Sequence, residues 1–364
     1  MSADVALVAD ALAAFAGAEK TFAVMCDAFP EADVFTSIYV PDQTVQDFRR
    51  RRIVELADRR VFRSVRDLKR WYPLAALQMG RMSFDRYRVV LSSAAHLGRY
   101  IRKGRARHLS YCYYPFRLLF EPQQYPQVAG LRRLLLRAAL PALRAWDMRK
   151  ARQVDRFVGI SQVSRDAIRR YYGRDADVIH PPVLNLPDGF EPLAREDFYL
   201  VVSRLERWKS LDLVVEAFRS LDERLIVVGD GPDRAALEAS ATPNVEFVGA
   251  VSEAELISYY RRARALIHAA NTEYGLTPIE ANAYGTPAIC LGLGGVLETM
   301  VPHGSDPDHA TALLFDQPTP AALVDAVRRF RALRFDPTVC HANARRFGRR
   351  EFVARLREYV ERYG

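Results

Sequence analysis

The sequence predicts an α/β protein with two doubly wound parallel sheets, each in a Rossmann-like domain. The chain has 364 residues, and single hydrophobic cores stop growing at roughly 250 to 300 residues. Short apolar runs alternate with helical patterns twice along the chain, and a Pro- and Gly-rich segment, residues 180–189, interrupts the alternation. We therefore expect two domains joined by a hinge, with a cleft where the carboxyl ends of both sheets can face one ligand.

The first alternation predicts an N-terminal domain over residues 1–182. Its helical pattern at 19–28 follows the first apolar run, and a long helical stretch precedes the last of the expected strands. These strands are rich in β-branched and aromatic residues, as sheet-forming segments are: 4–9, 32–40, 86–95, 108–115 and 154–161. Strands alternating with helices indicate a parallel sheet covered on both faces.

The second alternation predicts a C-terminal domain over residues 190–345. Strands are expected at 198–205, 224–232, 244–249 and 264–270, and helices at 210–221, 236–241, 252–263 and 278–285. A last helix, within residues 346–364, places four apolar residues on one stripe: Phe352, Leu356, Tyr359 and Val360. Such a stripe indicates that the helix packs on a domain, and we expect it to return to the first one.

Composition excludes several classes of protein. With 49% hydrophobic and 27% charged residues the chain is globular, and no run of about 18 uncharged apolar residues predicts a membrane span. The apolar start lacks a basic leader and contains Asp4 and Asp10, which argues against a secretory signal. Four cysteines without a CxxC pair predict neither a zinc site nor a disulfide framework. We expect a protein of the reducing cytoplasm.

The net charge of +9 is concentrated in the first half of the chain. Residues 48–77 place apolar side chains among arginines at roughly helical spacing, as in a basic amphipathic segment. One interpretation is a surface that docks on anionic lipid, peripheral to the inner face of the membrane. The other is a solvated helix face in an arginine-rich protein. Nucleic-acid binding is disfavoured, because no RNA or DNA module accompanies the charge.

The most informative stretch is NTEYGLTPIEANAYGTPAIC, residues 271–290, which holds two glutamates seven positions apart, Glu273 and Glu280. It predicts a loop and then a helix beginning near Thr277 or Pro278, since proline is tolerated in a first helical turn. The backbone N–H groups of such a turn attract phosphate or sugar oxygens, and Gly275 allows close approach. Carboxylates accept hydrogen bonds from vicinal hydroxyls. The stretch therefore suits a ligand that is both anionic and hydroxylated, such as a nucleotide sugar.

A diphosphate also needs cations, and Arg204 and Lys209 follow an expected strand in SRLERWKSLD. Arginine offers a planar fork to phosphate oxygens and lysine a point charge. Two basic residues in a loop of a basic protein are weak evidence alone. Three Gly-containing turns are similarly weak alone: Gly17 in FAGAEK, Gly229 in VVGDGP, and Gly294 with Gly295 in GLGGVLET.

Taken in order, these segments resemble glycosyltransferase family 4 over nearly the whole chain. This family comprises retaining enzymes of the GT-B fold, and the chain is most similar to its bacterial polysaccharide mannosyltransferases. The resemblance implies that Arg204 and Lys209 hold the diphosphate, with Gly17 beneath it, and that the backbone at Gly275, Leu276 and Thr277 meets phosphate or sugar oxygens. It further implies that Glu273 contacts the donor sugar, that Glu280 binds the ribose, and that the base lies near Gly229 and Val248.

Three positions depart from the family pattern. Ala16 precedes Gly17 where a second glycine is usual, and Ala312 stands where TGLLF has glycine. CYYPFR, residues 112–117, replaces CHTPMR, so that Tyr113 stands in place of a histidine that faces the sugar. Tyr113 and Arg117 are the residues of this segment expected to face the sugar or the acceptor.

The activity implied is metal-free transfer of a hexose, with mannose from GDP-mannose as the donor suggested by the resemblance. The acceptor would be a saccharide or lipid-linked saccharide of a cell-surface polysaccharide. No side chain is an obvious base, and the resemblance implies that a donor phosphate oxygen takes the acceptor proton. Two alternatives stay open: a sugar-nucleotide epimerase of the same fold, and a non-catalytic nucleotide-binding scaffold. A nicotinamide dehydrogenase is disfavoured, because neither expected sheet opens with GxGxxG.

Overall fold

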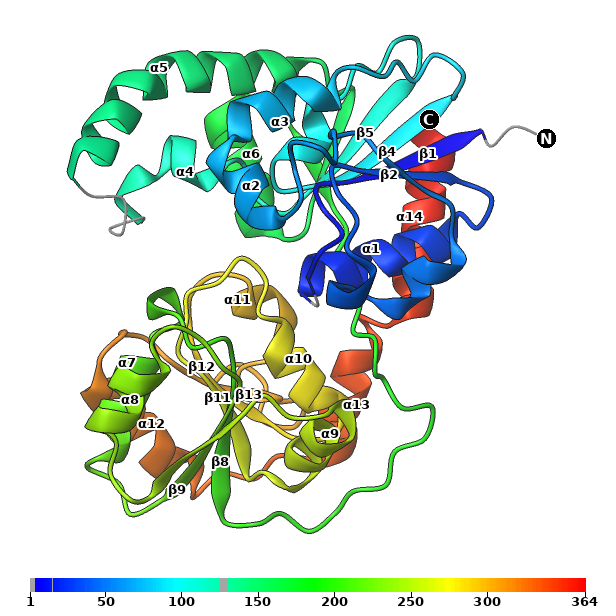
Figure 1. Ribbon diagram of the computed structural model, residues 1–364. Helices are drawn as coiled ribbons and strands as arrows, with labels where there is room; N and C mark the ends of the chain where they lie inside the picture. The colour runs from blue at the N-terminus through cyan, green and yellow to red at the C-terminus, as the bar shows by residue number, and fades with distance from the viewer. Residues whose placement is uncertain (1–3, 15, 125–129) are drawn as a thin grey trace. The chain divides into compact units, whose positions relative to one another are not determined.

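The computed structural model describes residues 4–14, 16–124 and 130–364, which form two compact units. Unit 1 comprises Met1–Pro182 with Arg349–Gly364, and unit 2 comprises Val183–Gly348. Each unit contains one parallel sheet (Figure 1). The boundary between the units falls within the Pro-rich segment at 180–189, and a second crossing follows Gly348.

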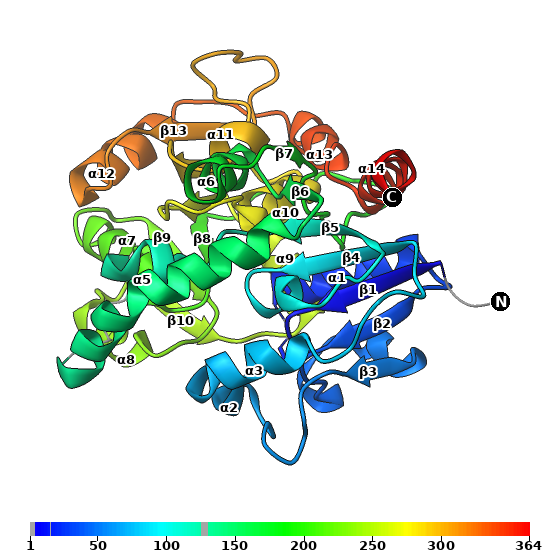
Figure 2. The same ribbon diagram turned by 90° about the horizontal axis from the view of Figure 1, so that it is seen from above.

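Unit 1 has a seven-stranded sheet in the order β3-β2-β1-β4-β5-β6-β7, which can be followed in Figure 2. The strands are β1 Val5–Ala9, β2 Asp33–Thr36, β3 Ile53–Glu55, β4 Val89–Ala94, β5 Arg107–Cys112, β6 Arg156–Gly159 and β7 Ala176–Val178. The helices are α1 Gly17–Ala28, α2 Val65–Arg70, α3 Tyr72–Met79, α4 Arg117–Phe120, α5 Gly130–Arg152, α6 Gln162–Tyr172 and α14 Arg349–Tyr363. The five strands expected from the sequence are β1, β2, β4, β5 and β6.

Unit 2 has a six-stranded sheet in the order β10-β9-β8-β11-β12-β13. The strands are β8 Phe198–Val202, β9 Arg224–Val228, β10 Val245–Gly249, β11 Ala265–His268, β12 Ala288–Leu291 and β13 Ala312–Phe315. The helices are α7 Leu211–Phe218, α8 Arg234–Ser240, α9 Glu253–Arg262, α10 Leu276–Ala283, α11 Val296–Thr299, α12 Pro320–Phe330 and α13 Pro337–Arg345. All pairings within this sheet are parallel, as the sequence predicted.

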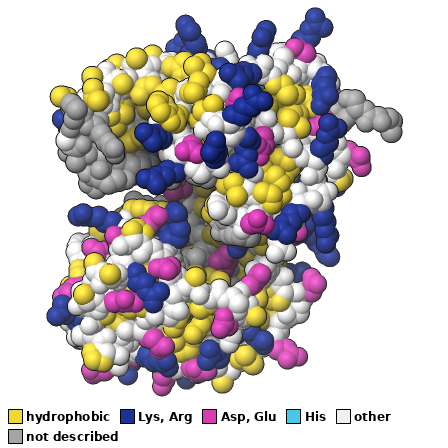
Figure 3. All heavy atoms as spheres, in the orientation of Figure 1, with side chains coloured by type: hydrophobic (Ala, Val, Ile, Leu, Met, Phe, Trp, Pro, Cys, Tyr) yellow, Lys and Arg dark blue, Asp and Glu magenta, His cyan; other side chains and the backbone are white. Residues whose placement is uncertain are grey.

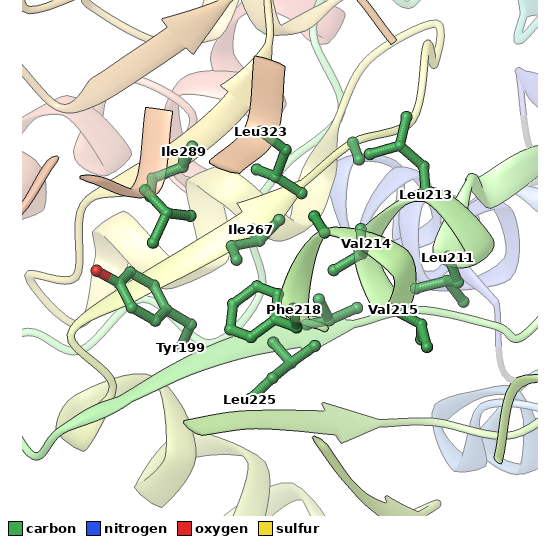
Figure 4. Packing of buried hydrophobic residues seen from close by; sticks show 14 of the residues in the cluster. Tyr199, Leu211, Leu213, Val214, Val215, Phe218, Leu225, Ile267, Ile289 and Leu323 are labelled. Atoms are coloured by element: carbon green, nitrogen blue, oxygen red, sulfur yellow. The ribbon is translucent and has the colours of Figure 1, made fainter. Parts of the chain in front are cut away.

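The core of unit 2 forms where α7 and α12 pack against the central strands (Figure 4). The apolar spacing of α7 places Val214 and Phe218 one turn apart, and both are buried against residues of the sheet such as Ile267. Burial of each such side chain contributes roughly 1.5–3 kcal/mol. This packing fixes the sheet whose strand ends carry the candidate site.

The C-terminal helix, α14, packs on α1 within unit 1. The four residues of its predicted apolar stripe are all buried: Phe352, Leu356, Tyr359 and Val360. Arg349 pairs with Asp27, and Arg357 donates to the carbonyl oxygen of Ala28 at 2.8 Å, so polar contacts hold the C-terminal end of α1 against α14.

The arginine-rich segment 48–77 differs from its prediction. It does not form one amphipathic helix, because it contains a 3-10 turn at Gln46–Arg50, strand β3, and then the two short helices α2 and α3. Its apolar residues Phe48, Phe62 and Leu68 are buried in unit 1. Their spacing therefore reflects a core rather than a continuous surface stripe. Within the residues described, no helix combines the length and the apolar character needed to cross a membrane.

Candidate functional site

The strand order of unit 2 reverses between β8 and β11. From β8 the chain proceeds outward to β9 and β10, and then returns to place β11 on the other side of β8, with Leu266 opposite Leu200. The loops after these two strands leave the same edge of the sheet in opposite directions. Open α/β sheets bind ligands in the crevice at such a point. Residues 203–210 and 269–275, the two most informative loops in the sequence, are therefore neighbours.

Lys209 is a half-buried cation in the loop after β8. Burial lowers its pKa to about 8, with the Arg204 guanidinium acting in the same direction and Glu206 opposing it. Its ammonium lies 3.8 Å from the centroid of the Trp208 ring, within reach of a cation–π interaction. Arg204 is exposed and pairs with Glu206 at 3.2 Å. The two cations act on one another, as a joint diphosphate site requires.

The residue after Lys209 has an unusual backbone conformation. Ser210 has φ 54°, the one positive φ of a non-glycine residue within the described parts of the chain, and it precedes α7. Such conformations cost of order 1–3 kcal/mol and concentrate at functional sites. This turn directs the chain from Lys209 into α7.

The loop after β11 ends at Gly275, which caps α10 with φ 77°. A Cβ at this position would lie 2.9 Å from Cγ1 of Val296, so both the backbone angle and the space require glycine. The helix begins at Leu276, one residue before the earliest predicted start, and Leu276 and Thr277 are half-buried. The first-turn N–H groups have no partner within the helix, so this end of α10 offers donors to an anion.

His268 is the principal residue that sequence reasoning missed. It ends β11, and its Nε2 lies 3.2 Å from Oγ1 of Thr272 while its Nδ1 lies 3.4 Å from Oγ1 of Thr277. The imidazole thus connects the loop before Gly275 to the first turn after it. Burial, followed by the charge of Lys209, lowers the pKa of His268 to about 3, which keeps the ring neutral.

The influence of Lys209 on His268 joins the two loops of the crevice. Because β11 pairs directly with β8, the loop that carries Lys209 lies beside the loop that leads into α10. This arrangement suits a site for one anionic group. A lone histidine in an apolar strand does not by itself predict a functional residue. Only the position of His268, at the end of a strand beside the strand reversal, could have indicated its role.

The two glutamates occupy the loop and helix as predicted. Glu273 is half-buried in the loop, and Glu280 is half-buried on α10. Oε2 of Glu280 accepts a hydrogen bond from the Tyr260 hydroxyl at 2.9 Å, which orients the carboxylate. Burial and this carboxylate raise the pKa of Tyr260, so the phenol remains the donor.

The Gly294–Gly295 loop approaches the backbone of the loop after β11 closely. The N–H of Gly295 donates to the carbonyl oxygen of Thr272 at 2.9 Å, and a Cβ on Gly295 would overlap the backbone at Glu273 and Tyr274. The close approach is thus to the protein backbone. This loop supports the segment that carries Glu273.

Gly229 and Val248 lie on the neighbouring strand ends. Gly229 follows β9, and its N–H donates to the carbonyl oxygen of Gly249 at 2.8 Å, while Val248 is half-buried in β10. The N–H of Leu205 donates to the carbonyl oxygen of Asp230 at 3.0 Å. The loops after β8, β9 and β10 are therefore tied together beside Arg204.

In unit 1, Tyr113 and Gly17 are brought together. Gly17 begins α1, and the Tyr113 hydroxyl lies 3.0 Å from the carbonyl oxygen of Ala18 and 3.0 Å from Oγ of Ser93. Burial raises the pKa of Tyr113. Arg117 begins α4, pairs with Glu121 at 3.6 Å and lies over the Tyr114 ring at 4.2 Å. Tyr113 thus holds the start of α1, and Arg117 interacts with its own segment.

The strand reversal of unit 1 lies between β1 and β4, and a carboxylate missed in the sequence ties it together. Oδ2 of Asp10 accepts the N–H groups of Ala95 and His96, each at 2.8 Å, and Oδ1 accepts that of Gly98 at 2.6 Å. The carboxylate after β1 thereby fixes the loop after β4. No cluster of three potential metal ligands occurs among the residues that the structure describes.

The second unit is similar to a known family of proteins. Residues 189–347 match the family described as "Glycosyl transferases group 1". The "D-rhamnosyltransferase WbpZ" of Pseudomonas aeruginosa is 26% identical over 193 residues, which cover 48% of this chain and 49% of the relative. The "GDP-mannose-dependent alpha-mannosyltransferase" of Mycobacterium tuberculosis is 36% identical over 103 residues, covering 28% and 27%. The chain thus spans about half or less of the curated relatives it matches.

Solved structures match the whole architecture. HepE of Anabaena, in complex with UDP and glucose, superposes with a TM-score of 0.70 at 16% identity and covers 98% of this chain and 99% of its own. At this identity the likeness establishes the fold, which is the two-sheet GT-B fold of glycosyltransferases.

Proposed function

We propose that this protein is a retaining glycosyltransferase that moves a hexosyl group from a nucleotide sugar to a saccharide or lipid-linked saccharide. The observation that carries the proposal is the strand reversal of unit 2, because the pairing of β11 with β8 brings the loop with Arg204 and Lys209 beside the loop that leads into α10. The group 1 family match over residues 189–347 supports a transferase enzyme.

The residues of unit 2 suit the leaving diphosphate. Lys209 and Arg204 offset its negative charge, and the first-turn N–H groups of α10 donate to its oxygens. These groups are already in place before reaction, and such preorganised electrostatics is usually the largest contribution to catalysis. Neutral His268 positions this turn through Thr272 and Thr277.

Glu273 and Glu280 suit the hydroxylated parts of the donor. Glu273 accepts from the sugar hydroxyls, and Glu280, oriented by Tyr260, accepts from the ribose. Transfer breaks the bond between the anomeric carbon and the diphosphate oxygen, forms a bond from that carbon to the acceptor oxygen, and moves the acceptor proton to a donor phosphate oxygen. No metal or other cofactor enters this scheme.

GDP-mannose is the donor we propose, with a role in cell-surface polysaccharide synthesis. A relative named as GDP-mannose-dependent supports this choice, whereas the HepE structure holds UDP and glucose. Incubation with GDP-mannose, UDP-glucose and other nucleotide sugars, with and without saccharide acceptors, tests it. We expect a transferred product with retained anomeric configuration by NMR. An epimerised donor formed without acceptor, or nucleotide binding without any product, would contradict the proposal.

We further propose a cytoplasmic protein that docks peripherally on anionic lipid through unit 1. Trp71 and Leu77 at α3 and Leu134 on α5 are 52%, 64% and 65% exposed. Arginines accompany them, and Figure 3 shows basic and hydrophobic side chains next to each other over the part of unit 1 that carries α5. Apolar and basic groups together favour an interface with anionic lipid.

Sedimentation with phosphatidylglycerol vesicles tests this docking. Trp71→Ser with Leu77→Ser should reduce the bound fraction, whereas Leu193→Ser, at another exposed apolar residue, should not. Equal binding by the wild type, the Trp71→Ser/Leu77→Ser variant and the Leu193→Ser variant would exclude docking through the surface around Trp71 and Leu77.

A further inference from the structure

A cationic cavity lies in unit 1, at the amino-terminal edge of its sheet. It has a volume of about 450 Å³, within the range of small-ligand sites. We name it the arginine pocket; its lining comprises Arg107, Asp155, Arg156, Arg174, Arg362, Tyr363 and Gly364. Arg107 begins β5 and Arg156 begins β6, while Arg362 and Tyr363 come from the end of α14.

The pocket lies at the opposite edge of the sheet from Tyr113 and the start of α1. Strand β5 separates Arg107 from Tyr113, and six residues at about 3.3 Å each span roughly 20 Å. Parallel strands place all amino ends at one edge and all carboxyl ends at the other. The arginine pocket is therefore separate from the unit 1 residues assigned to the donor and acceptor.

The four guanidinium groups of the pocket lack carboxylate partners. Within the described ranges of the chain, none of them lies within 4 Å of a carboxylate oxygen. Asp155, the one acidic side chain of the lining, is bound instead to Nζ of Lys103 at 2.7 and 2.6 Å and to the N–H of His108 at 2.8 Å. Asp155 also acts on Arg107, but one carboxylate does not offset four guanidinium groups, so the lining keeps a positive charge.

These guanidinium groups are held in place by other contacts. Arg174 donates to the carbonyl oxygens of Val154 and Asp155 at 3.0 and 2.9 Å, and to that of Ala151 at 3.5 Å. Since a guanidinium has five N–H donors, two remain for a ligand. Arg156 and Arg362 lie 4.7 and 5.3 Å from the centroid of the Tyr363 ring. Stacking on an aromatic ring restrains a guanidinium without using its N–H groups.

We propose that the arginine pocket binds a ligand that carries phosphate groups with at least two negative charges, such as a diphosphate. A planar guanidinium fork matches phosphate oxygens with two parallel hydrogen bonds. Several guanidinium groups around one cavity favour a multiply charged anion over a monovalent one. The diphosphate can be free in solution or part of a lipid head group, since both present the same oxygens.

Calorimetric titration with inorganic pyrophosphate tests the pocket. The titration uses the full chain with Arg204→Ala and Lys209→Ala, which removes the cations of unit 2 and keeps this test independent of the proposed donor site. One pyrophosphate should bind per chain. Addition of Arg156→Ala and Arg362→Ala should raise its Kd at least about tenfold, because each hydrogen bond to a charged group is worth about 1.5–3 kcal/mol.

A matched control separates the pocket from general surface charge. Arg350→Ala with Arg355→Ala removes the same two positive charges from exposed residues of α14, outside the pocket, and should leave the Kd unchanged. Vesicles that contain a polyprenyl diphosphate form the second arm: pocket-dependent vesicle binding without pyrophosphate binding assigns a lipid head group, and the reverse assigns a free ligand. Absence of pocket-dependent binding in both arms, or an equal loss in the control variant, would overturn the proposal.

Discussion

The ammonium of Lys209 acts on the imidazole of His268 across the strand reversal of unit 2. Burial and this charge together lower the pKa of His268 to about 3. Lys209 follows β8 and His268 ends β11, more than fifty positions later in the chain, yet these two strands are direct neighbours. This proximity places a cation beside the hydroxyls that flank the first turn of α10, and the predictions for donor binding depend on it.

Donor use should depend on pH through Lys209. The pKa of this side chain is lowered to about 8, so the cation is present below that pH and is lost as the pH rises through it. We expect kcat/KM for the nucleotide sugar to fall above about pH 8. Lys209→Arg should keep its charge and shift the fall to higher pH, although the altered geometry lowers the maximum rate. The same alkaline limit in both proteins would assign the titration to another group.

Glu273→Gln should reduce turnover sharply. The amide keeps the size of the side chain but loses the charge and the full acceptor capacity of a carboxylate. We expect kcat to fall about 100-fold or more, as for loss of one preorganised electrostatic contact. A cell-free transfer assay measures this effect, with Glu238→Gln, an exposed residue of α8, as the control. Normal turnover in Glu273→Gln would remove this residue from the site.

Gly275→Ala should destabilise unit 2 and weaken donor binding together. The added Cβ would lie 2.9 Å from Cγ1 of Val296, and the alanine would have to adopt an unfavourable φ of 77°. Gly173→Ala is the matched control, because it has φ 63° but nothing within 4 Å of the added atom. We expect the control to lose about 1–2 kcal/mol of unfolding free energy for the backbone alone. Denaturant unfolding should show a larger loss for Gly275→Ala, and Val296→Ala should partly restore it.

Stability should decrease in acid through His268. Its pKa is about 3 in the folded protein and about 6.5 when unfolded, so the unfolded chain binds more protons between these values. The stabilisation is complete above about pH 6.5 and is lost as the pH falls toward 3, by about 1.4 kcal/mol per pH unit. His108 has a similarly lowered pKa, to about 3, and adds to the same slope. Unfolding at several pH values should show a smaller slope for His268→Gln; an unchanged slope would mean that the ring is protonated in the folded state.

The parallel sheets could be predicted because their strands are short apolar runs bounded by turns, which a buried parallel sheet requires. The loops with Arg204, Lys209 and Glu273 could be predicted because cations, carboxylates and Gly275 stand together after such runs. His268 could not, since its importance arises only when β11 pairs with β8.

The arginine-rich segment shows the opposite difficulty. Phe48, Phe62 and Leu68 have nearly helical spacing, but tertiary packing buries them from separate short elements. Spacing alone cannot distinguish a surface stripe from such a core. The Gly294–Gly295 loop is similarly ambiguous in the sequence. Glycine is required both where a loop lies close to protein backbone and where it lies close to a ligand.

The most direct test of the donor site is the binding of GDP and UDP to the wild-type protein and to Lys209→Ala by calorimetry. We predict that at least one nucleotide binds the wild type, and that its Kd rises at least about tenfold in the variant, because a charge-assisted contact to the diphosphate is lost. Equal affinity in the two proteins would contradict a diphosphate site between Lys209 and the start of α10.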